Sequence, residues 1–596
     1  MEDKHTTSLF ETYLACHPLR LHAERTPFPR ARSRAAWEAL PPDTRKGLLR
    51  WGKEALSGYP ARPATAFLAF TRTGSRLADE EPYFRRRRLL MGAVLAECAE
   101  HEGRYLDAVI DGLWCICEET SWIISAHNGG QPLPDPCRPD IDLFAAQTAA
   151  TVAYSLYLLE DELNAAAATL VCRARHELDT RVIRPFFIRD DFWWMGLVRK
   201  DLNNWTPWIC SNVIDTLLLT PMDEAPAMDG LTRAMRILDR YLAVLPADGG
   251  CDEGVAYWNM AGGSLLDCLE SLRFATGADL YADPLIRAVG AFPLKAHIAD
   301  GWFWNFADCD AKPVLDAERI YTYGLRTYNS ALAALGARLF AGSRVFPPRD
   351  TPQMNRILQA LFTAVPAPSG ASKTERTISL PDLQVFAFER GGLYAAVKGG
   401  HNAESHNHND VGSFLLYLDG EPAVVDAGNM VYTAKTFGPD RYTLWNTRSR
   451  NHNLPLIGGC EQYAGAQARA AGVTAGENGV TMELAAAWPP EACVRSFRRT
   501  LTNDGAVTLS DTLALDSPQE VRWVFLLRQK PAQTEAGALQ TGRLTLRFDP
   551  ALCYACEEVP VTDARMARSF PGSLWRVTLT AAPAAEHRSV FRFSRS

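Results

Sequence analysis

Residues 406–426 read HNHNDVGSFLLYLDGEPAVVD and combine two histidines, a tight-turn signal and a terminal carboxylate. His406 and His408 stand two positions apart, so in an extended chain both imidazoles point to the same face. Asp419-Gly420 separates two apolar runs, and glycine tolerates the positive φ that a two-residue hairpin turn requires. The predicted hairpin therefore returns Asp426 to the neighbourhood of His408.

A third imidazole follows the hairpin at His452, within the sequence Arg-Asn-His-Asn. Two imidazoles and a carboxylate are ligands that suit Zn²⁺ or a similar divalent ion. The pattern predicts one metal ion held by His408, Asp426 and His452. A set of hydrogen-bonded loop histidines is the alternative that the spacing leaves open.

The order of these motifs resembles the heparinase II/III family of polysaccharide lyases. The shared features are His-Asn-His-Asn-Asp-x-Gly-Ser-Phe, a hairpin ending in Asp-Ala-Gly, and a later Asn-His-Asn. The resemblance implies that His406 lies in the active cleft and that the ligand set holds one divalent ion, Zn²⁺ ahead of Mn²⁺ or Ca²⁺. We expect this ion to act mainly as a structural brace for the loop of His406. The resemblance covers the C-terminal region well and parts of the N-terminal half.

Length and charge limit the class of protein. A chain of 596 residues exceeds what one hydrophobic core supports, so two or three domains are expected. A net charge of −7 offers no basic field, which disfavours a nucleic-acid partner and requires local positive groups for any acidic ligand. The N-terminus shows no signal peptide, and no apolar run is long enough to span a membrane. The predicted location is cytoplasmic, or secreted or periplasmic if a leader has been removed, with no membrane partner.

The periodicity changes along the chain. From Ser33 to about Phe362 apolar residues recur three and four positions apart, as consecutive helical hairpins require. Beyond a Pro/Gly/Ser-rich boundary at residues 366–372, short β-type runs joined by turns predict an antiparallel β-sandwich. The resemblance implies that the hairpins close into an incomplete (α/α) toroid. The expected fold is multidomain α+β, with an irregular lead-in (1–32), a toroid (33–370) and a heparinase II/III-like β-sandwich (371–596).

Residues 203–208, NNWTPW, place two amides beside two indoles. Amides can bind a carboxylate without competing for its protons, and indoles can stack on sugar rings. In the family that the chain resembles, an Asn in this region neutralises the uronate and a His often follows; Asn203 or Asn204 matches the Asn, but no His is present. Trp205 and Trp208 are predicted to contact the sugar. A helix start with aromatic core residues is the alternative.

Residues 248–258, DGGCDEGVAYW, resemble the family's acidic-glycine segment, which precedes a Tyr that acts as base or acid. The resemblance implies that Tyr257 transfers a proton and that His406 is its partner at one sugar ring. An unperturbed phenol titrates near ~10, so a base role needs a cationic neighbour, whereas an acid role toward the leaving oxygen needs less help. Glu253 either orients the site or holds a helix end. A packed Tyr257 with a satisfied hydroxyl is the alternative.

Four further side chains are candidate substrate contacts. His127 follows an apparent helix end and could replace the missing histidine, line a subsite, or serve only as a cap or core residue. Tyr432 and Tyr442 lie between the last two predicted ligands, where relatives carry cleft tyrosines. Arg448 can pair with a carboxylate or sulfate, with a plain surface role as the alternative.

Arg85-Arg86-Arg87-Arg88 is the densest basic run in the chain. Within a helix, four consecutive side chains spread around the surface, so they do not form one polyanion-binding patch. The run predicts a solvated helix face.

Together the candidate residues fit β-elimination on a uronate polymer, which needs donors on the carboxylate, a base for the C5 proton and an acid for O4. The predicted function is a polysaccharide lyase that acts on glycosaminoglycans such as hyaluronan, chondroitin or heparan sulfate and leaves unsaturated uronate ends. A lyase for alginate or another polyuronate is the second interpretation. A glycoside hydrolase using Asp252 and Glu253, or a non-catalytic glycan-binding protein, are the alternatives of another class. The expected partner is an acidic polysaccharide or oligosaccharide, and the sequence is compatible with a homodimer.

Overall fold

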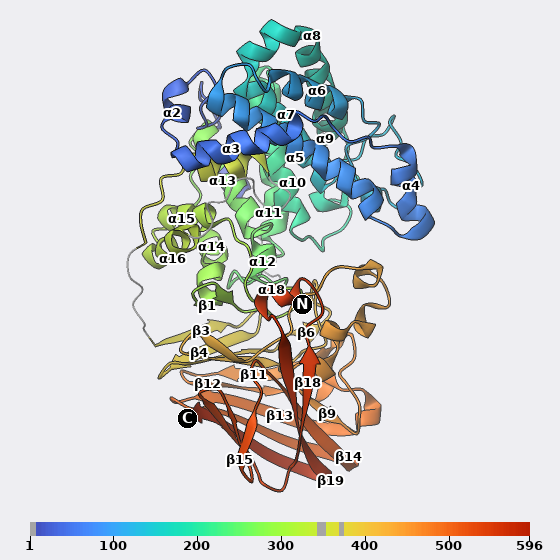
Figure 1. Ribbon diagram of the computed structural model, residues 1–596, viewed down its shortest axis with the longest axis vertical. Helices are drawn as coiled ribbons and strands as arrows, with labels where there is room; N and C mark the ends of the chain where they lie inside the picture. The colour runs from blue at the N-terminus through green and yellow to red at the C-terminus, as the bar shows by residue number, and fades with distance from the viewer. Residues whose placement is uncertain (1–7, 342–352, 369–374) are drawn as a thin grey trace. The chain divides into compact units, whose positions relative to one another are not determined.

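The computed structural model describes residues 8–341, 353–368 and 375–596 (Figure 1). The chain folds into two compact units, each built from three stretches of sequence. Unit 1 comprises Met1–Leu245, Asn259–Gly290 and Asp316–Pro368, and unit 2 comprises Pro246–Trp258, Ala291–Leu315 and Ser369–Ser596. The predicted domain boundary at residues 370 and 371 lies outside the described residues. Unit 2 thus takes two short segments from the part of the sequence that is otherwise helical.

Unit 1 is the predicted incomplete (α/α) toroid of helical hairpins, and its neighbouring helices pack in pairs such as α3 with α5, α7 with α10, and α15 with α16. The helices of the described chain are α1 (Leu9–Cys16), α2 (Arg34–Glu38), α3 (Pro42–Ala55), α4 (Ala64–Thr73), α5 (Leu77–Glu100), α6 (Leu106–Cys117), α7 (Leu143–Leu158), α8 (Glu160–Leu178), α9 (Arg184–Ile188), α10 (Trp205–Leu219), α11 (Glu224–Leu242), α12 (Val255–Trp258), α13 (Gly262–Thr276), α14 (Pro284–Ala296), α15 (Ala317–Arg326), α16 (Ser330–Ala341), α17 (Met354–Phe362) and α18 (Met566–Ser569). None of the described helices is both long enough and apolar enough to cross a bilayer.

The arginine run lies in α5. The prediction that its side chains are solvated is wrong for Arg86 and Arg87. Arg86 and Arg87 are buried, and both donate to the carboxylate of Glu119, at 3.0 Å and 2.6 Å. Arg62 reaches the same carboxylate at 3.3 Å. Burial alone would raise the pKa of Glu119, but the arginines, Arg87 foremost, outweigh it and lower that pKa. Arginines can thus be buried when they pair with a buried carboxylate from a distant part of the sequence. Helical periodicity does not reveal such a partner.

Unit 2 is the predicted antiparallel β-sandwich, with every strand pair antiparallel. Its main sheet runs β15-β16-β17-β19-β14-β8-β7-β5-β4-β3, and β9, β11, β12, β13 and β18 pair alongside. The strands of the described chain are β1 (His297–Ala299), β2 (Trp302–Phe303), β3 (Arg376–Leu380), β4 (Val385–Arg390), β5 (Leu393–Lys398), β6 (His401–Asn402), β7 (Phe414–Leu418), β8 (Glu421–Val424), β9 (Pro455–Ile457), β10 (Gly465–Arg469), β11 (Ala471–Ala475), β12 (Gly479–Glu483), β13 (Val494–Asn503), β14 (Val507–Leu527), β15 (Ala532–Glu535), β16 (Ala538–Thr541), β17 (Leu544–Arg547), β18 (Cys553–Pro560) and β19 (Ser573–Arg595).

The predicted hairpin is the β7–β8 pair. Leu418 pairs with Glu421, so Asp419 and Gly420 form a two-residue turn, and their φ values of 51° and 87° are both positive. A turn with both central residues left-handed matches the twist of an antiparallel pair. Asp426, two residues beyond β8, is consequently returned toward the segment that precedes β7.

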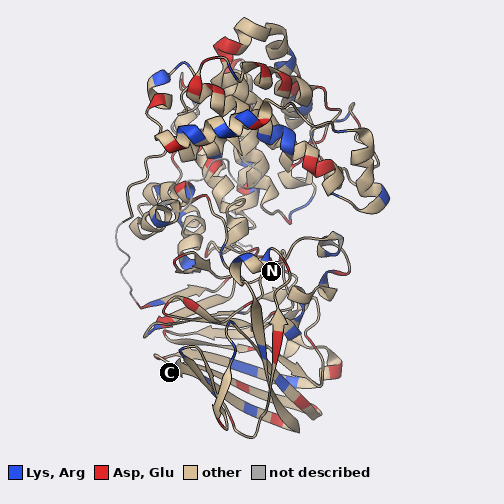
Figure 2. Ribbon diagram, viewed as in Figure 1, with Lys and Arg blue, Asp and Glu red and all other residues tan. Residues whose placement is uncertain are grey.

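One buried apolar cluster holds the sandwich together. Side chains of β4, β5 and β7 meet those of β12, β13, β14 and β19, and Phe414 of β7 packs edge-on against Phe525 of β14 with ring centroids 6.0 Å apart. Basic and acidic residues are interspersed along the helices and strands of each unit (Figure 2). The segments that precede β7 and follow β8 are therefore joined to strands of this close-packed core.

Candidate active site

Tyr257 and His406 lie side by side within unit 2. Tyr257 is in α12 and His406 is in the loop between β6 and β7; their ring centroids are 4.4 Å apart with the planes at 30°. The Tyr257 hydroxyl is hydrogen-bonded to the hydroxyl of Tyr432, whose ring centroid is 6.3 Å from that of His406. Although Tyr257 falls in the helical half of the sequence, the fold assigns its segment to the sandwich.

The surroundings of Tyr257 favour the protonated phenol. Burial raises its pKa well above the usual value, and Tyr432 and Asp308 raise it further. Burial likewise raises the pKa of Tyr432 to about 12. The guanidinium carbon of Arg565 lies 5.3 Å from the centroid of the Tyr432 ring, but this arginine is held by two hydrogen bonds to Asp310. Tyr257 is thus better suited to donate a proton than to accept one.

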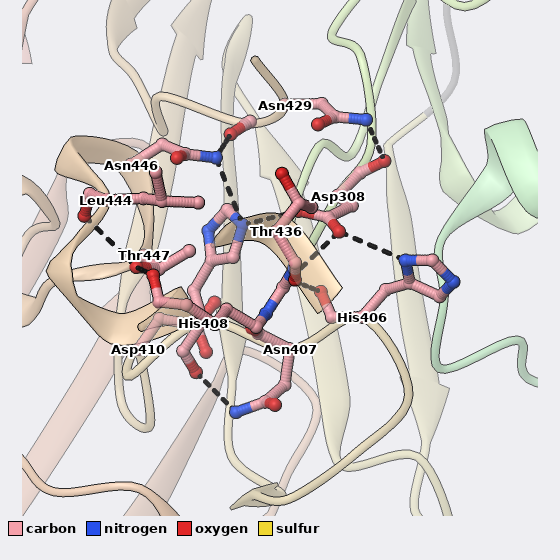
Figure 3. A network of polar contacts seen from close by, with 12 residues as sticks. Asp308, His406, Asn407, His408, Asp410, Asn429, Thr436, Leu444, Asn446 and Thr447 are labelled. Carbon is pink, nitrogen blue, oxygen red and sulfur yellow. Dashed lines mark hydrogen bonds and ion pairs between the residues drawn. The ribbon is translucent and has the colours of Figure 1, made fainter. Parts of the chain in front are cut away.

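Asp308 is a central residue that the sequence analysis did not identify. Its Oδ2 lies 3.0 Å from Nδ1 of His406 and its Oδ1 lies 3.1 Å from Nε2 of His408 (Figure 3). Arg441 donates to the same Oδ2 at 2.9 Å, and Asn429 donates to the Asp308 backbone oxygen at 2.8 Å. Burial alone would raise the pKa of Asp308, but its histidine and arginine partners outweigh that effect and keep it low.

His408, Asp426 and His452 come together as a fully buried group. One ligand atom from each lies within 4.8 Å of the others, and Nδ1 of His452 is 2.8 Å from Oδ2 of Asp426. Burial would raise the pKa of Asp426, but His452 outweighs it and lowers that pKa, so the carboxylate is ionised and can act as a ligand. The group could bind a metal ion.

The hydrogen bonds around this group fit a bound ion. Nε2 of His452 lies 2.9 Å from the backbone oxygen of Asn446, and Nε2 of His408 faces the Asp308 carboxylate. The carboxylate acceptor at Nε2 of His408 leaves Nδ1 of that ring as a lone-pair donor. Nδ1 of His452, which faces Asp426, would give up its hydrogen when an ion binds. Among the described residues, Nδ1 of His408 has no hydrogen-bond partner although it is buried. A divalent ion held by both Nδ1 atoms and Asp426 would satisfy it.

The remaining candidates of unit 2 have distinct partners. Glu253 is buried, with Oε1 3.9 Å from Nε2 of His406. Tyr442 donates from its hydroxyl to Oδ1 of Asn407 at 2.7 Å, next to His406. Arg448 forms an ion pair with Glu461, which also pairs with Arg450 at 2.6 Å. Glu253 and Tyr442 therefore surround the His406 loop, whereas the charge of Arg448 is shared with a carboxylate.

The candidates of unit 1 form a separate group around the start of α10. Asn203 accepts a hydrogen bond from the Trp205 backbone at 3.1 Å, and Asn204 is the buried residue that precedes the helix. The His127 ring centroid lies 4.7 Å from that of Trp205, and its Nδ1 is 2.7 Å from Oδ2 of Asp142.

Two more aromatic residues complete this group. Trp193, which the sequence analysis did not identify, packs 5.1 Å from Trp205, and Phe144 meets Trp208 edge-on at 5.9 Å. Trp193 and Trp205 are both half-buried, so each presents part of its indole to solvent. Partly exposed indoles beside amides are suited to binding a sugar ring.

Comparisons with known proteins support the fold and the family resemblance of the β region. Residues 373–577 match the family described as Heparinase II/III-like, C-terminal, which confirms the resemblance for the β region. A heparinase III structure is similar over 100% of this chain and 89% of its own, with 13% identity and a TM-score of 0.62. Heparan sulfate lyase HepC from Pedobacter heparinus is similar over 93% of this chain and 89% of its own (12% identity, TM-score 0.56). Streptomyces coelicolor A3 chondroitin AC lyase is similar over 93% of this chain and 83% of its own (14% identity, TM-score 0.52). No curated protein sequence matches the chain.

Proposed function

Because residues 373–577 form a heparinase II/III-like C-terminal domain, we propose that the chain is a polysaccharide lyase that cleaves uronate-containing glycans by β-elimination. The observation that carries the proposal is the adjacency of Tyr257 and His406, whose ring centroids are 4.4 Å apart. A phenol and an imidazole at this distance supply the acid and the base that the reaction needs. Each such group typically contributes about 10² to 10⁴ in rate.

In this mechanism His406 is the base. The Asp308 carboxylate only accepts hydrogen bonds, so Nδ1 of His406 carries the proton and Nε2 presents a lone pair. Nε2 takes the C5 proton of the uronate, and the electron pair of that C–H bond forms the C4–C5 double bond. The C4–O4 bond breaks as this double bond forms.

Tyr257 is the acid. The raised pKa of its phenol keeps the proton available for the departing O4, which becomes a hydroxyl. Tyr432 shares a hydrogen bond with Tyr257 and can replace the proton after transfer. Overall, one proton leaves C5 and one reaches O4, so charge and atoms balance.

The C5 proton is acidic enough only if the uronate carboxylate is neutralised. We assign this role to the amides of Asn203 or Asn204, on the resemblance of residues 203–208 to the family. Trp205, Trp208 and His127 are then sugar contacts of unit 1, and Tyr432, Tyr442 and Glu253 are contacts of unit 2. Amide donors aimed at developing charge are worth a few kcal/mol each.

The proposed ion at His408, Asp426 and His452 braces the loop of His406. We propose Zn²⁺, because two imidazoles and one carboxylate form a common ligand set for that ion. His408 lies two residues from His406 and the whole group is fully buried, so a bound ion would fix the loop without contacting the sugar.

A product assay tests the proposal. The protein is incubated with hyaluronan, chondroitin, heparan sulfate and alginate, and the expected result is the ultraviolet absorbance of an unsaturated uronate with at least one of them. We place glycosaminoglycans ahead of alginate because structurally similar proteins are named as lyases of heparan sulfate and chondroitin. Saturated products with new reducing ends would support a hydrolase instead. Binding without any product at several pH values would support a glycan-binding protein.

A further inference from the structure

The carboxylate of Asp308 joins two histidines that otherwise have separate roles. Oδ2 lies 3.0 Å from Nδ1 of His406, the proposed base, and Oδ1 lies 3.1 Å from Nε2 of His408, a member of the ion-binding group. Asp308 is about 1% exposed, so neither contact competes with bulk water. One buried carboxylate thus contacts the proposed ion site and the proposed catalytic base at the same time.

Each oxygen of this carboxylate fixes one tautomer. A carboxylate only accepts hydrogen bonds. The two nitrogens that face Asp308, Nδ1 of His406 and Nε2 of His408, must therefore both carry hydrogen. His406 therefore has its lone pair on Nε2, and His408 has its lone pair on Nδ1. The Nδ1 of His408 has no hydrogen-bond partner within the described chain. That atom is where an ion would bind.

The backbone reinforces the same connection. The Asp308 backbone N–H donates to the His406 carbonyl at 3.2 Å, and Arg441 donates at 2.9 Å both to that carbonyl and to Oδ2 of Asp308. His406 has a φ of 55°, a left-handed conformation that costs a non-glycine residue about 1 kcal/mol or more. The contacts from Asp308 (Figure 3) and from Arg441 hold His406 in this conformation.

We propose that Asp308 is a positioning residue that couples ion binding at His408, Asp426 and His452 to the orientation of His406. An ion on Nδ1 of His408 requires hydrogen on Nε2, and that hydrogen is donated to Asp308. The carboxylate is then held in the orientation that accepts from His406. Because Asp308 contacts both histidines, a change at Asp308 alters both ion affinity and catalysis. The catalytic half of this inference rests on the proposed lyase activity, whereas the ion half does not.

The test uses Asp308→Asn in the full chain. The amide keeps the shape but replaces one acceptor by a donor, so it can serve only one of the two histidines. We expect Zn²⁺ affinity, measured by competition with a chelator, to fall about 10- to 100-fold. We expect kcat to fall at least about 10-fold while KM stays within about 3-fold, because substrate contacts are retained. Glu389→Gln, the same carboxylate-to-amide change at an ion pair with Arg376 in the sandwich, should change neither quantity.

A double variant separates positioning from a general structural effect. If Asp308 acts through His406, Asp308→Asn combined with His406→Ala has the same kcat as His406→Ala alone. Unchanged Zn²⁺ affinity in Asp308→Asn overturns the inference, as does an unchanged kcat. If that variant does not fold, removal of the ion from the wild type by a chelator must lower kcat, and added Zn²⁺ must restore it. If the wild type cleaves no uronate polymer, the lyase proposal fails, and the Zn²⁺ affinities still decide whether Asp308 supports the ion site.

Discussion

The hydroxyl groups of Tyr257 and Tyr432, 175 residues apart in the sequence, share one hydrogen bond. Burial raises the pKa of both phenols, to about 12 for Tyr432, so near neutral pH both are protonated. A protonated pair beside the imidazole of His406 is arranged for proton donation to a leaving group.

Tyr257→Phe removes the proposed acid while keeping the ring that packs against His406. We expect kcat to fall by about 10² or more, with little change in thermal stability. The measurement is initial rate on the glycan that the wild type cleaves best, together with a melting curve. Tyr554→Phe, on strand β18 of the same unit, is the control. A wild-type rate for Tyr257→Phe would refute the assignment.

Tyr432→Phe tests the role of the second phenol. Because Tyr257 retains its own proton in this variant, we expect a smaller loss of kcat, on the order of 10-fold, than in Tyr257→Phe. Rates of both variants are compared on one substrate at one pH. A loss in Tyr432→Phe larger than that in Tyr257→Phe would instead make Tyr432 the principal acid.

The ion site makes a prediction that needs no substrate. The purified wild type should hold about one Zn²⁺ per chain, and His452→Ala should lose it, because two remaining ligands bind weakly. Metal content by mass spectrometry and the melting temperature with and without a chelator are the measurements. His401→Ala replaces a histidine outside the group, whose Nδ1 accepts from the Ala403 backbone, and it should keep the ion. Equal metal content in the two variants contradicts the assignment.

Asp215 in α10 should make the stability of unit 1 depend on pH. Burial, opposed by the hydrogen bond with Ser271, raises the pKa of Asp215 to about 7. Between about pH 4 and pH 7 the folded chain keeps a proton that the unfolded chain has released, so the free energy of unfolding falls as pH rises. Asp215→Asn removes this contribution, which is at most about 1.4 kcal/mol per pH unit.

Urea unfolding at pH 5, 6, 7 and 8 measures that dependence. The difference between Asp215→Asn and wild type should grow in favour of the variant up to about pH 7 and then level off. Asp229→Asn, at an exposed position of α11, is the matched control and should parallel the wild type. Parallel curves for Asp215→Asn as well would rule out a buried proton at this position.

Glu119 is the acceptor of three arginines, and its replacement should be costly. Glu119→Gln leaves Arg86 and Arg87 buried beside a neutral amide, a change that typically costs about 3–5 kcal/mol. The neighbouring Glu118 is exposed, so Glu118→Gln should have almost no effect. Chemical denaturation of both variants gives the comparison, and equal losses would show that the buried cluster contributes nothing specific.

The sequence predicted the parts of the site that lie close together along the chain. The Asp-Gly turn placed Asp426 near His408, and the β7–β8 register confirms that turn. Asp308 could not be found in this way, because it lies 98 residues before His406 in an irregular segment without a recognisable spacing. The burial of Arg86 and Arg87 was not predicted for the same reason. Helical periodicity does not show that both arginines pair with Glu119.

The composite origin of unit 2 has a consequence for how the chain can be cut and how it is synthesised. Residues 246–258 and 291–315 are synthesised before any strand of the main sheet, so they cannot pack against the rest of unit 2 until residues 376–595 have been made. A fragment starting at residue 373 carries the ion ligands but neither Tyr257 nor Asp308. Such a fragment would contain the proposed ion site but not the proposed acid, Tyr257. Expression should therefore use the full-length gene.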